Sequence, residues 1–314
     1  MSPEAVPVSI VIPILNESET LPALLSALAA QNAQPAELIF VDAGSSDRSV
    51  AIIQDWWRDE PRGNCRLLVL EEVGAFPGGA RNAGIARATQ PWVAFLDAGV
   101  TPDRDWLRTL MDAARSGGAA GVFGVTSFTG RDALSTALCA LSYGQGAACS
   151  TLPGSVFHHD VFSSVGLFDP ALRAGEDVLW LRKYREAWPG AVTEPKATAT
   201  YSHFPASLGA AARKWFEYER HVTRARVSGS LPLVHIAVAV VAVTVLAIDA
   251  SAALTLFLLY LVARGIVDPI RRSARWSWWR EQPASAVLAL PCAAVIDAAK
   301  ITGCIAGLVE RAHV

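Results

Sequence analysis

Continuous apolar runs alternate with amphipathic segments through the first two hundred residues. The apolar runs are rich in β-branched residues and predict strands at residues 6–14, 36–42, 65–71 and 91–97. Helical spacing of apolar positions predicts helices at residues 17–31, 46–57, 77–89 and 103–117. Because the strands are apolar at successive positions, we expect an α/β fold with a mostly parallel sheet and helices on both faces. Ligands of such sheets bind beyond the carboxyl ends of the strands.

The alternation becomes less regular after Gly118. A strand is predicted at 119–128, and a short strand, a turn and a short helix at 153–169. A helix follows at 175–188, and then an extended segment at 191–203. The N-terminal run "VPVSIVIPIL" has no basic residues before it and contains two prolines, so it is interpreted as a strand and not as a signal peptide.

The segment 207–227 predicts an amphipathic helix with five basic and two acidic residues. Trp215, Tyr218 and Val222 share one face of it, and arginines lie elsewhere on the wheel. Two interpretations are open: a solvated surface helix, or an interfacial helix lying on anionic lipid. The apolar segments that follow favour the second.

Three apolar segments occupy the C-terminal third, at 231–248, 250–267 and 286–309. The first two are each about 27 Å long as helices, near the lower limit for a bilayer core of about 30 Å, and are joined at Asp249 as a helical hairpin. Four arginines and three tryptophans follow at 271–280, which is typical of a cytoplasmic membrane interface. The third segment contains Pro291, Asp297 and Lys300, and is either a third span or an interfacial or re-entrant helix. The predicted divisions are 1–205 catalytic domain, 206–230 interfacial helix and 231–314 membrane region.

The composition agrees with membrane attachment. Charged residues make up 18% of the chain and hydrophobic residues 52%, whereas soluble domains carry about 25% charge. A net charge of -2 gives no basic field for nucleic acid, which is therefore not an expected partner. The five cysteines form no metal-binding or disulfide pattern and are interpreted as reduced or buried thiols.

Two predicted strands end in a carboxylate, at Asp42 and at Asp97. Since the carboxyl ends of parallel strands meet at one edge of the sheet, both should border a shared cleft. A carboxylate at the end of a buried strand needs a ligand, a metal or backbone donors. The alternative is that these acids cap the next helix, which is the favoured interpretation for Asp47.

A glycine-rich stretch, "GAFPGGARNAG" at 74–84, lies between the third and fourth strands. It matches neither the P-loop nor the dinucleotide-binding pattern. Its glycines allow close approach of backbone to a ligand, and Arg81 and Asn82 would point into the same space.

Five blocks occur in an order that resembles the family 2 glycosyltransferases of the GT-A fold, over about residues 6–205. The blocks are "VSIVIPILNE", "VDAGSSDRS", "PGGARNAG", "FLDAG" and "GEDVLWLRK". The resemblance implies transfer of a sugar from a nucleotide-sugar donor with inversion at the anomeric carbon. It also implies donor-binding roles for Pro13, Asn16, Glu17, Asp42, Arg81 and Asp97.

The same resemblance assigns the chemistry. Asp177 would be the general base that takes a proton from the acceptor, with Glu176 as the alternative. Asp97 would face ribose and a divalent metal, Mn²⁺ or Mg²⁺, on the donor diphosphate. His203 is a further candidate metal or phosphate contact, or else a plain surface histidine.

Two departures from the family pattern change the expectation. Gly99 stands where the Asp-x-Asp motif has its second acid, so the metal should bind together with the donor. Processive members carry Q-x-x-R-W on an interfacial helix, and this chain has Ala211, Lys214 and Trp215 at the corresponding positions. We therefore expect one sugar per encounter, and we expect Arg213, Lys214 and Trp215 at the acceptor and membrane interface.

These observations predict a multi-pass enzyme of the inner (plasma) membrane with a cytoplasmic catalytic domain. Its partners would be a nucleotide-sugar donor, the lipid bilayer and a lipid-linked acceptor such as a polyprenyl phosphate. A degenerate, non-catalytic membrane scaffold or partner subunit is the alternative, and Gly99 is its only support. Nucleotidyl transfer is disfavoured because no glycine-rich phosphate loop follows the first strand closely.

Overall fold

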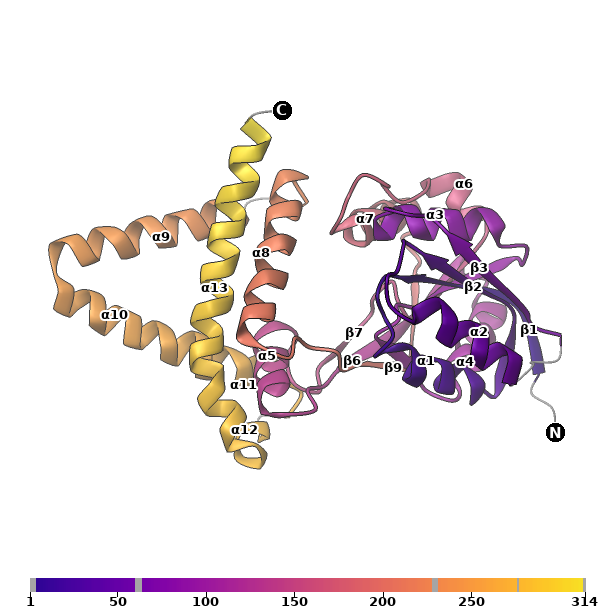
Figure 1. Cartoon of the computed structure of the whole chain (residues 1–314), viewed down its shortest axis with the longest axis horizontal. Coiled ribbons are helices and arrows are strands. Elements are labelled where there is room, and N and C mark those ends of the chain that lie inside the picture. The colour runs from indigo at the N-terminus through magenta and orange to yellow at the C-terminus, as the bar shows by residue number, and fades with distance from the viewer. Residues whose placement is uncertain (1–3, 60–63, 228–230, 276, 313–314) are drawn as a thin grey trace. The chain divides into compact units, whose positions relative to one another are not determined.

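The computed structural model describes residues 4–59, 64–227, 231–275 and 277–312 (Figure 1). Trp276, one of the predicted interfacial tryptophans, lies outside them, as do residues 228–230 of the predicted interfacial segment. The chain divides into two compact units. The first comprises Met1–Ser127 and Ala148–Tyr201, and the second comprises Phe128–Ala147 and Ser202–Val314.

The first unit is built on one nine-stranded sheet. Its strand order is β3-β2-β1-β4-β8-β6-β9-β5, with β7 paired to β6. The strands are β1 Glu4–Ile14, β2 Ala33–Asp42, β3 Arg66–Glu71, β4 Trp92–Phe95, β5 Val100–Pro102, β6 Gly121–Phe128, β7 Ala148–Cys149, β8 Ser155–His158 and β9 Val192–Tyr201.

The parallel part of the sheet contains the four strands with continuous apolar runs. β1 pairs in parallel with β2 and β4, and β2 pairs in parallel with β3. Four further pairs are antiparallel: β4 with β8, β6 with β8, β6 with β7, and β5 with β9. Strand β9 also neighbours β6. The sheet is therefore mixed, and the expectation of a mostly parallel sheet holds only for its first half.

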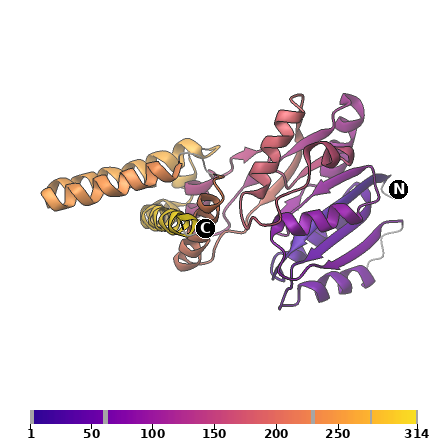
Figure 2. The same cartoon turned by 90° about the horizontal axis from the view of Figure 1, so that it is seen from above.

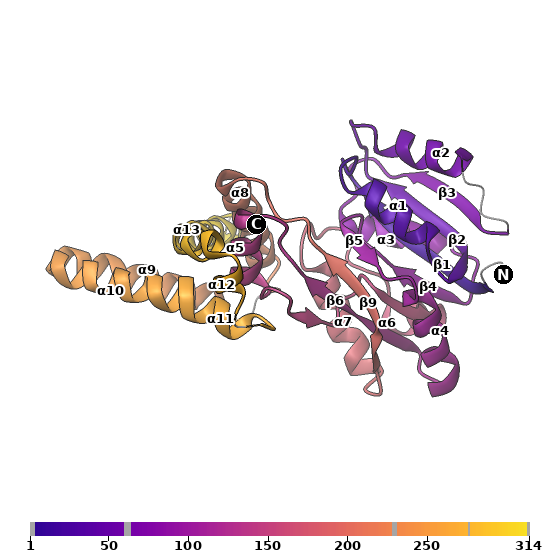
Figure 3. The ribbon, with the colours of Figure 1, turned by 90° about the horizontal axis from the view of Figure 1, so that it is seen from below.

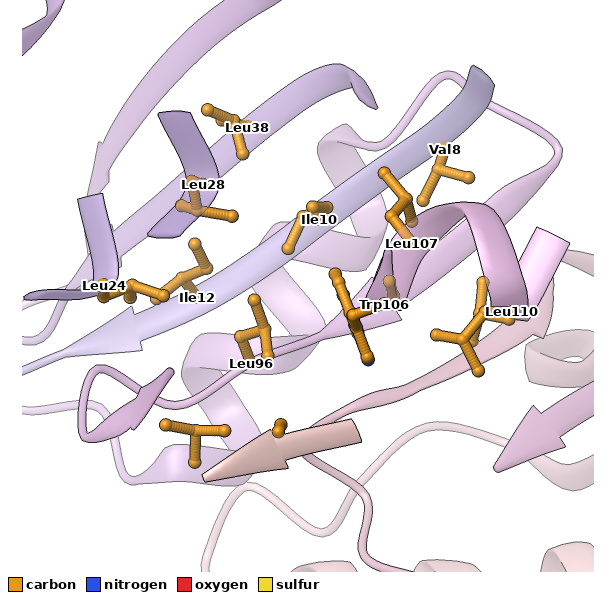
Figure 4. Packing of buried hydrophobic residues seen from close by; sticks show 14 of the residues in the cluster. Val8, Ile10, Ile12, Leu24, Leu28, Leu38, Leu96, Trp106, Leu107 and Leu110 are labelled. Atoms are coloured by element: carbon orange, nitrogen blue, oxygen red, sulfur yellow. The ribbon is translucent and has the colours of Figure 1, made fainter. Parts of the chain in front are cut away.

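Helices cover both faces of this sheet (Figure 2). Along β1, Val8, Ile10 and Ile12 pack on one face with helices α1 and α4 (Figure 4). Val11 packs on the other face. Burial of both strand faces explains the unbroken apolar runs. The helices of this unit are α1 Leu21–Ala29, α2 Ser49–Asp59, α3 Pro77–Arg87, α4 Trp106–Gly117, α6 Asp160–Val165 and α7 Glu176–Ala187.

The second unit is helical. Its buried core joins α5, α8 and α13 through residues such as Leu138, Trp215 and Ile296. Helices α9 and α10 meet at Asp249 and extend away from α13 (Figures 1 and 3). Its helices are α5 Ala133–Ser142, α8 Leu208–Arg224, α9 Leu231–Ile248, α10 Ala250–Val262, the π-helix η1 Ala263–Val267, α11 Asp268–Arg272, α12 Trp278–Glu281 and α13 Pro283–Ala312.

The structure adds two points to the sequence-based organisation of this unit. Helix α5 groups with the C-terminal helices although it precedes residue 205. Among the described residues, two helical stretches are long and apolar enough to cross a membrane by length and composition, Ala250–Arg272 and Pro283–Ala312.

Candidate active site

The carboxyl ends of three parallel strands gather the acids and loops that the sequence singled out. Asp42 is the last residue of β2 and lies in register with Ile14 at the end of β1. Asp97 follows β4, the neighbour of β1 on its other side, by two residues. The predicted convergence at one edge of the sheet therefore holds for β1, β2 and β4.

Arg81 of α3 is the buried cation at this edge. Its Nη2 lies 2.8 Å from Oδ1 of Asp97, and its Nη1 lies 2.6 Å from Oε1 of Glu176. The arginine and glutamate side chains are 4% and 6% exposed, whereas Asp97 is 43% exposed. Although burial opposes its charge, the two carboxylates raise the pKa of Arg81, which stays a fixed cation. Its Nε has no hydrogen-bond partner among the described residues.

Two glycines allow α3 to carry Arg81 to this position. A Cβ on Gly84 would lie 2.3 Å from Cγ1 of Val11 in β1, so the helix rests directly on the strand. A Cβ on Gly78 would lie 2.6 Å from the carbonyl oxygen of Asp169 and 3.2 Å from Cγ of Glu176. The glycine-rich stretch therefore serves close packing of the helix around the arginine.

Asn82 fixes the loop that leads to α7. Its Nδ2 donates to the carbonyl oxygen of Phe168 at 2.8 Å, and its Oδ1 accepts from the amide of Phe168 at 3.0 Å. The guanidinium of Arg81 lies 5.7 Å from the centre of the Phe168 ring. Asn82 was expected to point toward a ligand, but its side-chain amide instead bonds the backbone of Phe168.

Glu176 and Asp177 begin helix α7 but differ in environment. Glu176 is buried against Arg81, and burial together with the Asp177 carboxylate raises its pKa, against the effect of Arg81. Asp177 is part-exposed, and its Oδ1 accepts from the amide of Val178 at 2.8 Å. Of the two acids, only Asp177 remains outside the short ion pair with Arg81.

The turn after β2 is held by Asp42 together with the loop after β1. Asp42 accepts from the amide and hydroxyl of Ser45 at 3.0 and 2.6 Å. Asn16 adopts a left-handed backbone with φ of 56°, its amide donates to Oγ of Ser45 and its Oδ1 accepts from the amide of Ser46. The two loops are thus joined by side chains that the sequence analysis regarded as separate.

A second set of contacts supports the same loops. Asp47 accepts from the amide of Ser49, the first residue of α2, and from that of Ser18. The amide of Glu17 donates to Oγ of Ser49, while Pro13 lies within β1. Ser45 and Ser49 escaped the sequence analysis, although both lie in the quoted block "VDAGSSDRS".

The metal-binding capacity of this edge is small. Nowhere in the described part of the chain do three His, Cys, Asp or Glu side chains group to hold an ion. Asp97 has one oxygen on Arg81, and Gly99 offers no side chain. These residues fit a divalent cation only if a ligand such as a diphosphate supplies most of its oxygens. His203 belongs to the second unit.

The three residues expected at the acceptor and membrane interface lie in α8. Arg213 and Lys214 are exposed. Trp215 is 8% exposed and packs into the core of the second unit. We expected it on the interface surface, and its burial corrects that expectation. Ala211 is fully buried in the same core.

Residues 9–157 match the family model described as Glycosyl transferase family 2. The match covers β1 to β8 and therefore includes Arg81 and Asp97. Residues 9–157, slightly under half of the chain, are therefore similar to a family 2 glycosyltransferase domain.

Relatives of this domain are named as glycosyltransferases or as polysaccharide biosynthesis proteins. The succinoglycan biosynthesis protein ExoO of Rhizobium meliloti is 34% identical over 36% of this chain and 31% of its own length. Glycosyltransferase AglE of Haloferax volcanii is 28% identical over 57% of this chain and 62% of its own length. The undecaprenyl-phosphate 4-deoxy-4-formamido-L-arabinose transferase of Serratia proteamaculans is 36% identical over 35% of this chain and 34% of its own length. The chain thus spans between 31% and 62% of the length of these relatives.

Solved structures share the fold of the family 2 domain. The mannosyltransferase PcManGT from Pyrobaculum calidifontis, in complex with GDP-Man and Mn²⁺, has a TM-score of 0.52 and 18% identity, over 97% of this chain and 86% of that one. S. aureus TarS 1-349 in complex with UDP-GlcNAc has a TM-score of 0.50 and 14% identity, over 93% and 90%. The fold is therefore GT-A, as the resemblance implied.

Proposed function

We propose that this chain is a membrane-attached, inverting and non-processive glycosyltransferase. The observation that carries the proposal is the buried Arg81, which joins Asp97 to Glu176 beside the part-exposed Asp177. The site lies where ligands of parallel sheets bind. A nucleotide-sugar is the proposed donor, and both solved neighbours named above are complexes with one.

Arg81 supplies fixed positive charge beneath the proposed diphosphate position and keeps Asp97 oriented. Asn16, Glu17, Pro13 and Asp42 belong to the β1 and β2 ends, where the nucleoside would lie. Asp97 would hold Mn²⁺ or Mg²⁺ together with the donor, and His203 stays a candidate second contact. When bound, the ion would neutralise charge on the departing nucleotide diphosphate.

Asp177 is the proposed general base. Glu176 is held 2.6 Å from Arg81 in a buried site, so its carboxylate is committed to that pair. Asp177 would take the proton of an acceptor hydroxyl while the acceptor oxygen bonds to the anomeric carbon and the nucleotide diphosphate leaves with the bonding pair. Attack opposite the leaving group gives inversion.

The proposed acceptor is lipid-linked, and the proposed location is the inner (plasma) membrane with the catalytic unit on the cytoplasmic side. Two helical stretches are long and apolar enough to cross a membrane, and one relative is named as an undecaprenyl-phosphate transferase. Non-processivity is supported by Ala211, which is fully buried where processive enzymes carry glutamine. Replacement of Ala211 by glutamine would require the surrounding core to repack.

The test uses the full chain in detergent with a panel of UDP-, GDP- and dTDP-sugars, with and without Mn²⁺. One donor at about 100 times its Kd should stabilise the protein by about 2.7 kcal/mol, measured as a rise in Tm. Asp97→Asn should weaken the part of the shift that needs Mn²⁺, and Asp177→Asn should keep the shift but lose transfer. If no donor raises the Tm, the scaffold interpretation replaces this one.

A further inference from the structure

Helices α8 and α13 touch backbone to backbone. A Cβ on Gly303 would lie 2.4 Å from the carbonyl oxygen of Phe216, and a Cβ on Gly307 would lie 2.4 Å from that of Arg220. Both contacts advance by four residues, so the helices run in the same direction. The ion pair of Arg220 with Glu310, at 2.6 Å, continues the contact to the end of α13.

This packing ties α13 to a charged partner. Helix α8 carries the exposed cations Arg213, Lys214 and Arg224, and the part-exposed Glu217 and Arg220. These residues lie beside the C-terminal half of α13. If that half of α13 crossed the hydrocarbon core, α8 would have to enter it with all of these charges, which is strongly unfavourable.

The hairpin of α9 and α10 presents the opposite surface. Most of its described outward side chains are apolar and exposed. Only 6% of its most apolar stretch, in Ala250–Arg272, is buried, against 39% in α13. Apolar exposure of this extent on two adjoining helices is typical of a lipid-facing surface. The exposed apolar side chains are Val240, Val241, Val243, Leu246, Ile248, Leu254, Leu256, Phe257, Leu258, Leu259, Val262, Ile266 and Val267.

The segments that precede and follow the hairpin, α8 and η1, contact α13 at different heights. Gly265 of η1, which follows α10, packs on Leu290, with its Cβ position 3.1 Å from the Cα of that residue. Thr223, in the last turn of α8 and eight residues before α9 begins, lies against Gly307, and α9 itself contacts α13 (Figure 1). These points on α13 are 17 residues apart, or about 25 Å of helix. Helix α13 therefore lies across the mouth of the hairpin.

We propose that the bilayer receives only the α9–α10 hairpin, while α13 lies along the membrane surface with α8 and does not cross. If both legs of the hairpin enter from one side, a helix that spans their roots lies parallel to that side. The arginines at the end of the hairpin, Arg271, Arg272 and Arg280, match anionic headgroups there. The C-terminus then lies on the same side of the membrane as the first unit. This inference rests on the proposed membrane attachment but not on sugar transfer.

Cysteine labelling tests the proposal in the full-length membrane-bound protein. Cys149 of the first unit is exposed and marks its side, and Ala312 is the exposed last residue of α13. One variant carries Cys65→Ser and keeps Cys149. The other carries Cys65→Ser, Cys149→Ser and Ala312→Cys. The double serine variant alone measures background from the three buried cysteines. A membrane-impermeant maleimide is applied to inverted and to right-side-out vesicles.

We expect both cysteines to be labelled in the same vesicle preparation, with at least tenfold less label in the other. Label on Ala312→Cys from the side opposite to Cys149 would overturn the proposal, as would label that needs detergent. A protein that carbonate washing removes from the vesicles would contradict the attachment itself. Donor-dependent stabilisation in detergent reports on the proposed function separately, so the two failures are distinguishable.

Discussion

Each unit of this protein contains an arginine held by two carboxylates, but only one of these clusters is fully paired. In the second unit, Arg264 bonds to Asp297 at 3.0 Å and to Asp268 at 2.7 Å. The hydroxyl of Tyr260 also donates to Asp297, and Arg272 also donates to Asp268. Each of these acids therefore has two partners.

The cluster of the first unit is left open. Arg81 is more buried than Arg264, at 4% against 17%, yet its Nε has no partner among the described residues and Asp97 stays 43% exposed. A buried charge with unused capacity costs stability. A fully paired cluster therefore serves to hold helices together, whereas a cluster with unpaired polar atoms keeps those atoms available to bind a ligand.

The largest effect should follow from Asp177→Asn. The substitution removes the proposed base without touching the ion pair, so kcat should fall by about 10²–10⁴-fold with an unchanged Tm. The measurement is transfer of radiolabelled sugar at saturating donor. Asp268→Asn is the matched change in the closed cluster and should lower the Tm while donor binding persists. A mild defect in Asp177→Asn would favour a phosphate over a sugar hydroxyl as acceptor, because a phosphate needs no base.

Next in size is the loss of the arginine itself. Arg81→Met leaves Glu176 buried without its cation, and we expect about 3–5 kcal/mol of destabilisation. Arg264→Met should cost about 1.5–3 kcal/mol, because Asp297 keeps Tyr260 and Asp268 keeps Arg272. Hydrogen–deuterium exchange of peptides from α7 and from α13 would measure both. Equal losses of stability in the two units would show that the deeper burial of Arg81 does not make its cluster more sensitive to loss of the arginine.

One closely packed glycine in each unit gives a smaller contrast. Gly84→Ala and Gly303→Ala both force a Cβ to within 2.4 Å of a neighbour, and each should cost about 1–3 kcal/mol. Gly84 lies one turn from Arg81, so only Gly84→Ala should also lower kcat/KM. Gly79→Ala is the control, because its nearest contact would be 3.6 Å away. Thermal unfolding and donor titration provide the two readouts.

The smallest effect concerns pH and compares Glu176 with a fully paired carboxylate of the same unit, Glu37. Burial acts to raise the pKa of Glu37, but hydrogen bonds from Ser9 and Thr89 lower it below 4.5. The contribution of Glu37 to the free energy of unfolding is therefore present above pH 4.5 and is lost as the pH falls through the pKa of its folded state. Glu37→Gln should flatten that acid-side loss in a urea series. The pKa of Glu176 is raised. Its contribution to the free energy of unfolding is therefore present below pH 4.5 and is lost as the pH rises through the pKa of its folded state.

The sequence predicted the parallel strands and the edge where Asp42 and Asp97 end, because unbroken apolar runs report burial on both faces. The bonds of Arg81 could not be read from it, since its partners lie 16 and 95 residues away. Extended segments were predicted at 119–128, within 153–169 and at 191–203, but their antiparallel pairing was not, because the pattern of apolar residues does not report strand direction. Trp215 was misplaced because helical spacing does not tell a lipid-facing stripe from one that packs on another helix.

Helix α5 has a practical consequence for anyone who wishes to prepare the catalytic unit alone. A stop codon after residue 205 would remove α8 and α13 but leave α5, whose buried residues from Ala137 to Leu141 would be exposed to water. Such a fragment should aggregate. Because Ser127 of β6 pairs with Ala148 of β7, residues 129–147 can be exchanged for a short hairpin loop. A soluble catalytic fragment therefore requires two changes: truncation after residue 205 and replacement of residues 129–147.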